Sequence, residues 1–154
     1  MEQLKPRQLD IMQNLAKMLG EKGPVKITTS LLSKECGITE AAIYRHFPSK
    51  RKIYSGLVDF CEKNIFDLIA NINSSDGDEL EKTKKILILL VTFSEKNPGL
   101  ARLLTREAFS VDETSLDERI GQMMSKIELL IKQNLQKYEQ ETKKKLELPT
   151  ASAA

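Results

Sequence analysis

Two short segments that each begin with threonine, one on either side of a glycine, constrain the fold of this 154-residue chain more than any other feature. The letters TTSLLSKEC begin at Thr28, the letters TEAAIYRHF begin at Thr39, and Gly37 lies between them. A threonine oxygen can accept from free N–H groups in a helix's first turn, and glycine can adopt the left-handed conformation that ends a helix. We therefore expect a short helix capped by Thr28 or Thr29, then a second over 40–46 capped by Thr39. This arrangement is a helix-turn-helix.

The flanking residues extend this unit to three helices. Apolar residues recur at helical spacing over 9–20, and Gly20 with the letters EKGP that follow it predicts the end of that helix. Pro48 ends the second short helix, because the residue before a proline avoids the helical region. Ser49 then caps a long helix over about 50–72.

The remainder of the chain predicts further helices and no strand. The apolar run ILILLV at 86–91 is compatible with a buried strand, but its length and charged flanks favour a helix over about 79–96 that is buried on most sides. Two more helices are expected over 98–109 and 114–145. The fold class is therefore all-α, with a three-helix head followed by a helical bundle. The predicted domains are a helix-turn-helix domain, a helical regulatory domain and a tail, at residues 1–48, 49–146 and 147–154.

Charge and composition exclude several other classes of protein. Residues 1–52 carry ten Lys and Arg against five Asp and Glu, whereas the rest of the chain is acidic. This modest surplus favours a polyanionic partner for the amino-terminal end. One histidine and two separated cysteines, Cys36 and Cys61, supply no metal ligand set, so we expect free thiols in a cytoplasmic protein and no metal or cofactor. No apolar run is long enough to cross a membrane, and we expect no signal peptide.

The second short helix is the expected DNA reader. In a helix-turn-helix this helix lies in the major groove with its first residues at the base edges, where small side chains permit close approach. A tyrosine and a histidine at its end, and a lysine in the first turn of the next helix, can donate to phosphates, aided by free N–H groups after Ser49. By itself a lone histidine beside aromatic residues is more often structural, and only the preceding helix-turn-helix favours the DNA interpretation. The expected DNA-binding residues are Thr28, Thr29, Thr39, Glu40, Ala41, Ala42, Tyr44, His46 and Lys50.

The stretch ITTSLLSKECGITEAAIYRHFPSKRKIYSGLVDF, which ends at Phe60, resembles the DNA-binding head of the TetR family of transcriptional regulators. Its YRHFPSK pattern is characteristic of that family. Together with FSEKNPGLARLLTREAF, which starts at Phe93, the chain is similar to a branch of nucleoid occlusion factors. The resemblance implies a nucleoid-associated homodimer that binds palindromic double-stranded DNA and, when bound, antagonises polymers of the tubulin-like division protein FtsZ. It also implies a partner surface that includes Phe60, Leu89 and Lys96.

The end of the sequence bears on the dimer. TetR-family members usually continue with two further helices that form the dimer interface, and this sequence ends at LPTASAA, where the first of them is expected. We therefore expect either a shortened chain or an altered mode of dimerisation. The mode of dimerisation matters for DNA binding, because the two heads of a dimer must lie about 34 Å apart to read a palindrome.

Two other functions are weighed against a DNA-binding division regulator. A ligand-responsive TetR-type repressor would need a pocket in the helical bundle, to which the 86–91 run and the Met123–Met124 pair could contribute. An enzyme is disfavoured, because the only histidine is assigned to the DNA face and the sequence has no Gly-rich phosphate loop.

Overall fold

The computed structural model describes residues 3–21, 26–106 and 114–146 of the chain. Across these residues it contains α-helices and no strand, as the sequence predicts, and the ILILLV run lies in a helix. The helices are α1 (Pro6–Glu21), α2 (Thr29–Cys36), α3 (Glu40–His46), α4 (Lys50–Asn73), α5 (Glu79–Lys96), α6 (Pro98–Leu104) and α7 (Thr114–Thr142).

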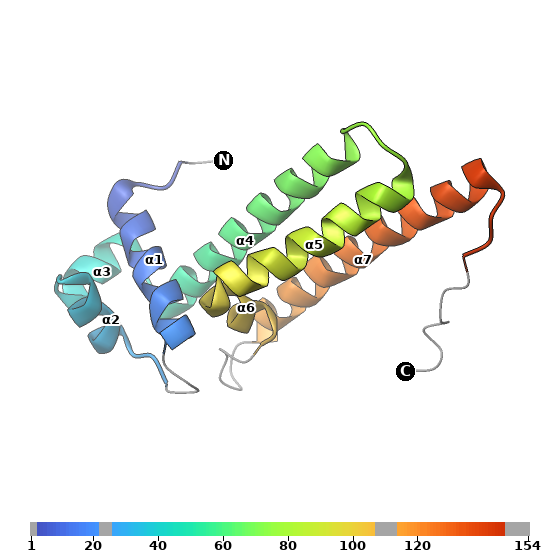
Figure 1. The fold of residues 1–154 in the computed structure, drawn as a ribbon. Helices are drawn as coiled ribbons and strands as arrows, with labels where there is room; N and C mark the ends of the chain where they lie inside the picture. The colour runs from blue at the N-terminus through green and yellow to red at the C-terminus, as the bar shows by residue number, and fades with distance from the viewer. Residues whose placement is uncertain (1–2, 22–25, 107–113, 147–154) are drawn as a thin grey trace.

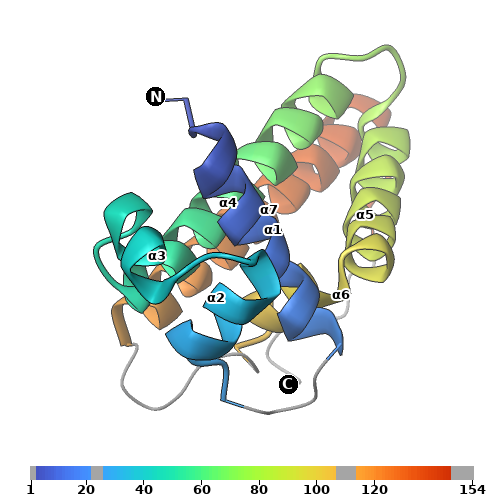
Figure 2. The same cartoon turned by 90° about the vertical axis from the view of Figure 1, so that its left-hand side faces the viewer.

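The helices form two groups, which we call the head (α1–α3) and the body (α4–α7). The long helices α4, α5 and α7 run side by side, and α1–α3 gather at one end of this bundle (Figure 1). Viewed from the head, α2 and α3 lie outermost, while α1 passes in front of the bundle and contacts α6 (Figure 2). The head therefore presents its two short helices away from the body.

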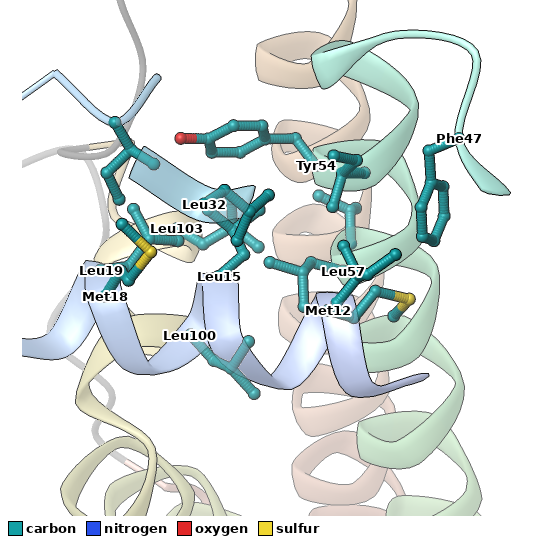
Figure 3. Close-up of a cluster of buried hydrophobic side chains, with 14 of the residues drawn as sticks. Met12, Leu15, Met18, Leu19, Leu32, Phe47, Tyr54, Leu57, Leu100 and Leu103 are labelled. Carbon is teal, nitrogen blue, oxygen red and sulfur yellow. The ribbon is translucent and has the colours of Figure 1, made fainter. Parts of the chain in front are cut away.

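Two buried apolar clusters hold this arrangement together. The first joins the head to the near end of the body and includes Met12, Leu15, Leu32 and Leu103, all at most 2% exposed (Figure 3). Phe47 also belongs to it, as expected for a residue between the head and the following helix. The second cluster fills the bundle farther from the head, with members Ile65, Ile69, Ile86, Met123 and Ile127. Since the first cluster contains residues on both sides of position 48, the division into domains there stays a prediction.

Polar contacts then fix α7 to its neighbours. The Arg119 guanidinium donates to the Ser55 hydroxyl at 3.3 Å and to a Glu62 carboxylate oxygen at 3.1 Å, and it also pairs with Asp59. At the other end of the bundle, the Lys137 ammonium lies 3.0 Å from a Glu79 carboxylate oxygen. These pairs add polar contacts between α7 and the helices α4 and α5 to the apolar packing of the bundle.

Several predicted boundaries are wrong by a few residues. Helix α1 begins at Pro6, because proline suits the first turn of a helix. It ends at Glu21, one residue beyond the predicted end, and Gly20 is also a point of close contact with Gly99 of α6. Helix α6 ends at Leu104, and the predicted continuation over 107–109 lies outside the described residues. Helix α7 ends at Thr142, before the exposed lysines at 143–145.

The expectation that α5 is buried on most sides is also wrong. Ile86 is fully buried, but Leu87, Ile88 and Val91 are 49%, 64% and 59% exposed. The main contacts of α5 are with α4, α6 and α7, which leave these side chains uncovered. In the part of the chain that the structure describes, no helix is long and apolar enough to cross a membrane.

Candidate nucleic-acid interface

The turn between α2 and α3 has the local chemistry that its sequence predicts. Thr28 caps α2, and its hydroxyl accepts from the backbone N–H of Leu31 at 3.1 Å. Gly37 ends the helix with a left-handed φ of 65°, and the next residue donates back into α2, from the Ile38 N–H to the Ser33 carbonyl at 3.1 Å. This pattern of bonds closes the helix end and points the chain into α3.

Helix α3 is capped at its start and anchored by one side chain. The Thr39 hydroxyl accepts from the Ala42 N–H at 3.1 Å. Ile43 is fully buried against the head core, so the opposite side of α3 faces solvent. Glu40 and Ala41 are exposed and Ala42 is half-buried. The small side chains therefore lie at the accessible start of the helix, as a helix that enters a groove requires.

The structure brings two of the expected DNA-binding residues together across the turn. The Tyr44 hydroxyl lies 3.4 Å from the Thr29 hydroxyl oxygen, and Tyr44 is 47% exposed. This contact links α3 to α2. His46 is half-buried, and its backbone carbonyl accepts from the Gln8 side-chain amide at 3.2 Å, which ties the end of α3 to α1.

Lys50 lies on a different element from these residues. Ser49 caps α4 as predicted, with its hydroxyl accepting from the Lys52 N–H at 3.3 Å. Lys50 is half-buried, and its ammonium lies 5.6 Å from the centre of the Tyr54 ring. In this structure the Lys50 side chain therefore packs over the buried ring of Tyr54. Its phosphate-binding role stays a prediction.

The basic side chains on this side of the head are available for phosphates. Two of the acidic residues of the head are paired, Asp10 with Arg7 at 3.4 Å and Glu35 with Lys17 at 3.3 Å. Five further basic residues, from just before α2 to the first turn of α4, are exposed and form no ion pair within the described ranges. They are Lys26, Lys34, Arg45, Arg51 and Lys52. Unpaired cations around α3 favour attraction of a polyanion.

Arg45 is the interface candidate that the sequence analysis missed. It is exposed on α3, one turn after Ala41. Residues four apart lie on the same side of a helix, so this spacing alone was enough to find it. An arginine at this position can reach a phosphate or the O6 and N7 atoms of guanine.

The three expected partner-binding residues do not form one patch. Phe60 is 37% exposed and lines a cleft of about 280 Å³ between α1, α4 and α6, together with Asn97. Lys96 is exposed and lines an adjacent cleft with Asn97. Leu89 is half-buried and packs against the second apolar cluster. Phe60 and Lys96 thus lie near each other on the outside of the body, whereas Leu89 contributes mainly to its packing.

Comparison with known proteins assigns the chain to a family. A family model of bacterial regulatory proteins of the tetR family matches residues 11–57. A second, the SlmA-like, tetracyclin repressor-like C-terminal domain, matches residues 77–154. The nucleoid occlusion factor SlmA of Aliivibrio fischeri strain MJ11 is 44% identical over 133 residues, which cover 85% of this chain and 68% of the relative. The chain belongs to the SlmA branch of the TetR family.

Other members of the branch agree with this assignment. SlmA of Vibrio campbellii is 40% identical over 130 residues, and SlmA of Shewanella woodyi is 43% identical over 129 residues. These matches cover 84% of the chain and 66% of each relative. The chain therefore spans about two thirds of the length of the SlmA proteins that it matches. These relatives are named as occlusion factors and not as enzymes.

Solved structures support the fold independently. The fatty acid degradation regulator FadR of Bacillus halodurans superposes with a TM-score of 0.77 at 20% identity, covering 99% of this chain and 78% of that one. A TetR-family transcriptional regulator of Bordetella parapertussis gives a TM-score of 0.73 at 12% identity, covering 89% and 71%. At such low identity these structures establish the TetR-type fold alone.

Proposed function

We propose that this chain is a nucleoid occlusion factor: it binds specific palindromic DNA through α2 and α3 and, when bound, antagonises assembly of an FtsZ-type division protein over the chromosome. The observation that carries the proposal is the identity of 40–44% to SlmA proteins over most of the chain. The exposed start of α3 supports it, because the caps at Thr28 and Thr39 hold the reader helix with its small side chains outward.

In this proposal the head reads DNA in two ways. The start of α3, with Thr39, Ala41 and Ala42, lies against base edges, where methyl groups can contact thymine. Tyr44, His46, Lys50 and the N–H groups at the start of α4 donate to phosphates. Arg45 joins them as an additional donor. The protein is then nucleoid-associated because of this site.

The phosphate contacts are tested by salt dependence. Each lost Lys or Arg contact to a phosphate lowers the slope of log affinity against log salt by about 0.9. We expect His46→Ala with Lys50→Ala to weaken binding to every duplex and to lower the slope by roughly 0.9, because only the lysine carries a formal charge at pH 7. The matched control is Lys132→Ala with Lys144→Ala, two exposed lysines, one in α7 and one just beyond its end. If the variant with both His46→Ala and Lys50→Ala kept the salt slope and the affinity of the unchanged protein, the proposed phosphate contacts would be contradicted.

The division role is tested separately, by light scattering of FtsZ polymers. We expect the chain to reduce scattering more with a palindromic operator duplex than with a scrambled duplex of equal length. Phe60→Ala and Lys96→Ala are expected to keep DNA affinity and to lose the effect on polymers. An effect that is equal with and without operator would contradict DNA-dependent antagonism.

A ligand-responsive repressor is less well supported. The pocket among α4, α5, α6 and α7 has a volume of about 160 Å³. Pockets for drug-sized ligands span roughly 300–1,000 Å³. The lining is mostly apolar, with Ile65, Leu90, Phe93, Ser94, Ala101, Leu104, Thr105, Met124 and Ile127. A space of this size favours a packed core at this place in the body, whereas a larger cleft of about 520 Å³ lies along α4 beside Lys126 of α7.

A further inference from the structure

A cleft runs along α4 and reaches α7, which lies beside α4 in the bundle (Figure 1). Its volume is about 520 Å³, within the range of roughly 300–1,000 Å³ that pockets for small molecules span. It extends along α4 from Gly56 to Asp67, a distance of about 16 Å at the helical rise of about 1.5 Å per residue. A space of this length suits an extended molecule better than a compact one.

The apolar part of the cleft is largely aromatic. Phe60 and Phe66 of α4 line it, and Leu4, which precedes α1, contributes from the head. Phe60 is 37% exposed and Leu4 is 43% exposed. These side chains offer an apolar surface that the chain of a ligand can cover.

The acidic side chains of the cleft already have cationic partners. Asp59 and Glu62 both pair with Arg119 of α7, and Asp67 pairs with Lys63 one turn earlier in α4. These pairs neutralise most of the negative charge in the cleft, so they lower its repulsion of an anion.

Lys126 of α7 is the remaining charged residue that lines the cleft. Its ammonium lies 4.2 Å from the centre of the Phe66 ring. The side chain is exposed and forms no ion pair with any residue that the structure describes. The aromatic ring holds the cation in place by its negative face, while the N–H donors of the ammonium stay available to a ligand.

We infer that this cleft binds an elongated carboxylic acid with an apolar chain. The carboxylate lies on the Lys126 ammonium, and the chain follows Phe66 and Phe60 along α4. One unpaired ammonium balances one carboxylate by a charge-assisted hydrogen bond, whereas a phosphate ester with two negative charges would need further donors. None of the expected DNA-binding residues lines this cleft, so the ligand site is separate from the DNA site.

The test is isothermal titration calorimetry of the full chain with decanoate, and with decanol as the uncharged probe of equal chain length. Decanoate is expected to bind saturably, with one molecule per chain. Lys126→Gln is expected to weaken decanoate binding about fivefold and to leave decanol binding unchanged. A general disturbance of the fold would weaken both probes alike, so the selectivity for the anion identifies the role of the ammonium.

Two further variants make the result specific. Lys132→Gln removes the same charge from an exposed lysine of α7 that does not line the cleft, so decanoate affinity should not change. Asp67→Asn removes a carboxylate from the Lys126 end and frees Lys63 from its partner. This variant is expected to strengthen decanoate binding about threefold, an effect opposite in sign to that of structural damage.

Three results would overturn this assignment. The first is the absence of saturable decanoate binding to the unchanged chain. The second is a decanoate affinity that Lys126→Gln leaves unchanged, or that it lowers only together with the decanol affinity. The third is an equal loss of affinity in Lys132→Gln, since the net charge of the chain and not the cleft would then attract the acid.

Discussion

Gly99 of α6 lies so close to Ala16 of α1 that a methyl group on Gly99 would overlap the Ala16 carbonyl oxygen. One turn along α1, a methyl group on Gly20 would come within 3.2 Å of the Gly99 backbone nitrogen. Two helix backbones can approach this closely only where side chains are absent. Through this contact the head rests directly on the backbone of the body.

Gly99→Ala is expected to destabilise the protein although alanine is the better helix former. Overpacking at a rigid backbone contact costs about 1–3 kcal/mol, so we expect a loss of roughly 2 kcal/mol in the free energy of unfolding by urea. Gly121→Ala is the matched control. A methyl group there meets only the end of the Arg106 side chain, which can move, and the higher helix propensity should leave stability equal or greater. If Gly99→Ala were as stable as Gly121→Ala, α1 and α6 could move apart to admit the methyl group without a loss in the free energy of unfolding.

The Thr39 cap predicts a difference between two small substitutions. Thr39→Ala removes the oxygen that accepts from the Ala42 N–H, and loss of such a cap costs about 1 kcal/mol. Thr39→Ser keeps the oxygen and should retain most of the stability. Thermal unfolding of the two variants measures the difference. A stability for Thr39→Ala equal to that of Thr39→Ser would show that the hydroxyl does not cap α3.

The buried carboxylate of Glu79 predicts a loss of stability in acid. Its side chain is only 8% exposed, and the hydrogen bond from Lys137 lowers its pKa below the ordinary value of 4.5, with Lys82 contributing. A depressed carboxyl pKa stabilises the fold above the ordinary value, and this contribution disappears as the pH falls from there through the folded pKa. We therefore expect the urea midpoint to fall below about pH 4.5.

Glu79→Gln is the variant that isolates this effect. It should be less stable than the unchanged chain at neutral pH and should show a flatter dependence of the urea midpoint on pH in the acid range. Glu128→Gln removes an exposed carboxylate from α7 and serves as the control. An acid profile of Glu79→Gln that parallels the unchanged chain would exclude Glu79 as the group responsible.

The two cysteines are expected to differ in reactivity. Burial raises the pKa of the Cys61 thiol to about 12, and this side chain is fully buried. Cys36 is half-buried at the end of α2, with a pKa raised by burial and by the nearby Asp10 and Glu35. Because the thiolate is the nucleophile, native protein should react with iodoacetamide slowly at Cys36 and only after unfolding at Cys61. Mass spectrometry of the labelled peptides separates the two, and rapid native labelling of Cys61 would contradict its burial.

Much of this fold could be predicted from local sequence signals. The caps at Thr28, Thr39 and Ser49, and the left-handed turn at Gly37, depend on interactions within a few residues, so a single sequence contains the information that decides them. The helical assignment of 86–91 was also available, because helix length and flanking charge are local properties. The expected DNA-binding residues followed from the same reasoning, since the order of helices, caps and turn determines which end of α3 is exposed.

The tertiary structure decided the features that depend on distant residues. Gly20 marks the end of a helix in the sequence, and only the approach of α6 shows that it is also a contact point. The exposed side of α5 could not be predicted either, because an apolar run shows that burial is favourable but not which neighbours are present to provide it. The sequence alone thus determined where the helices lie and which end of α3 is exposed. Three-dimensional packing determined how closely the head rests on the body and which apolar residues remained exposed.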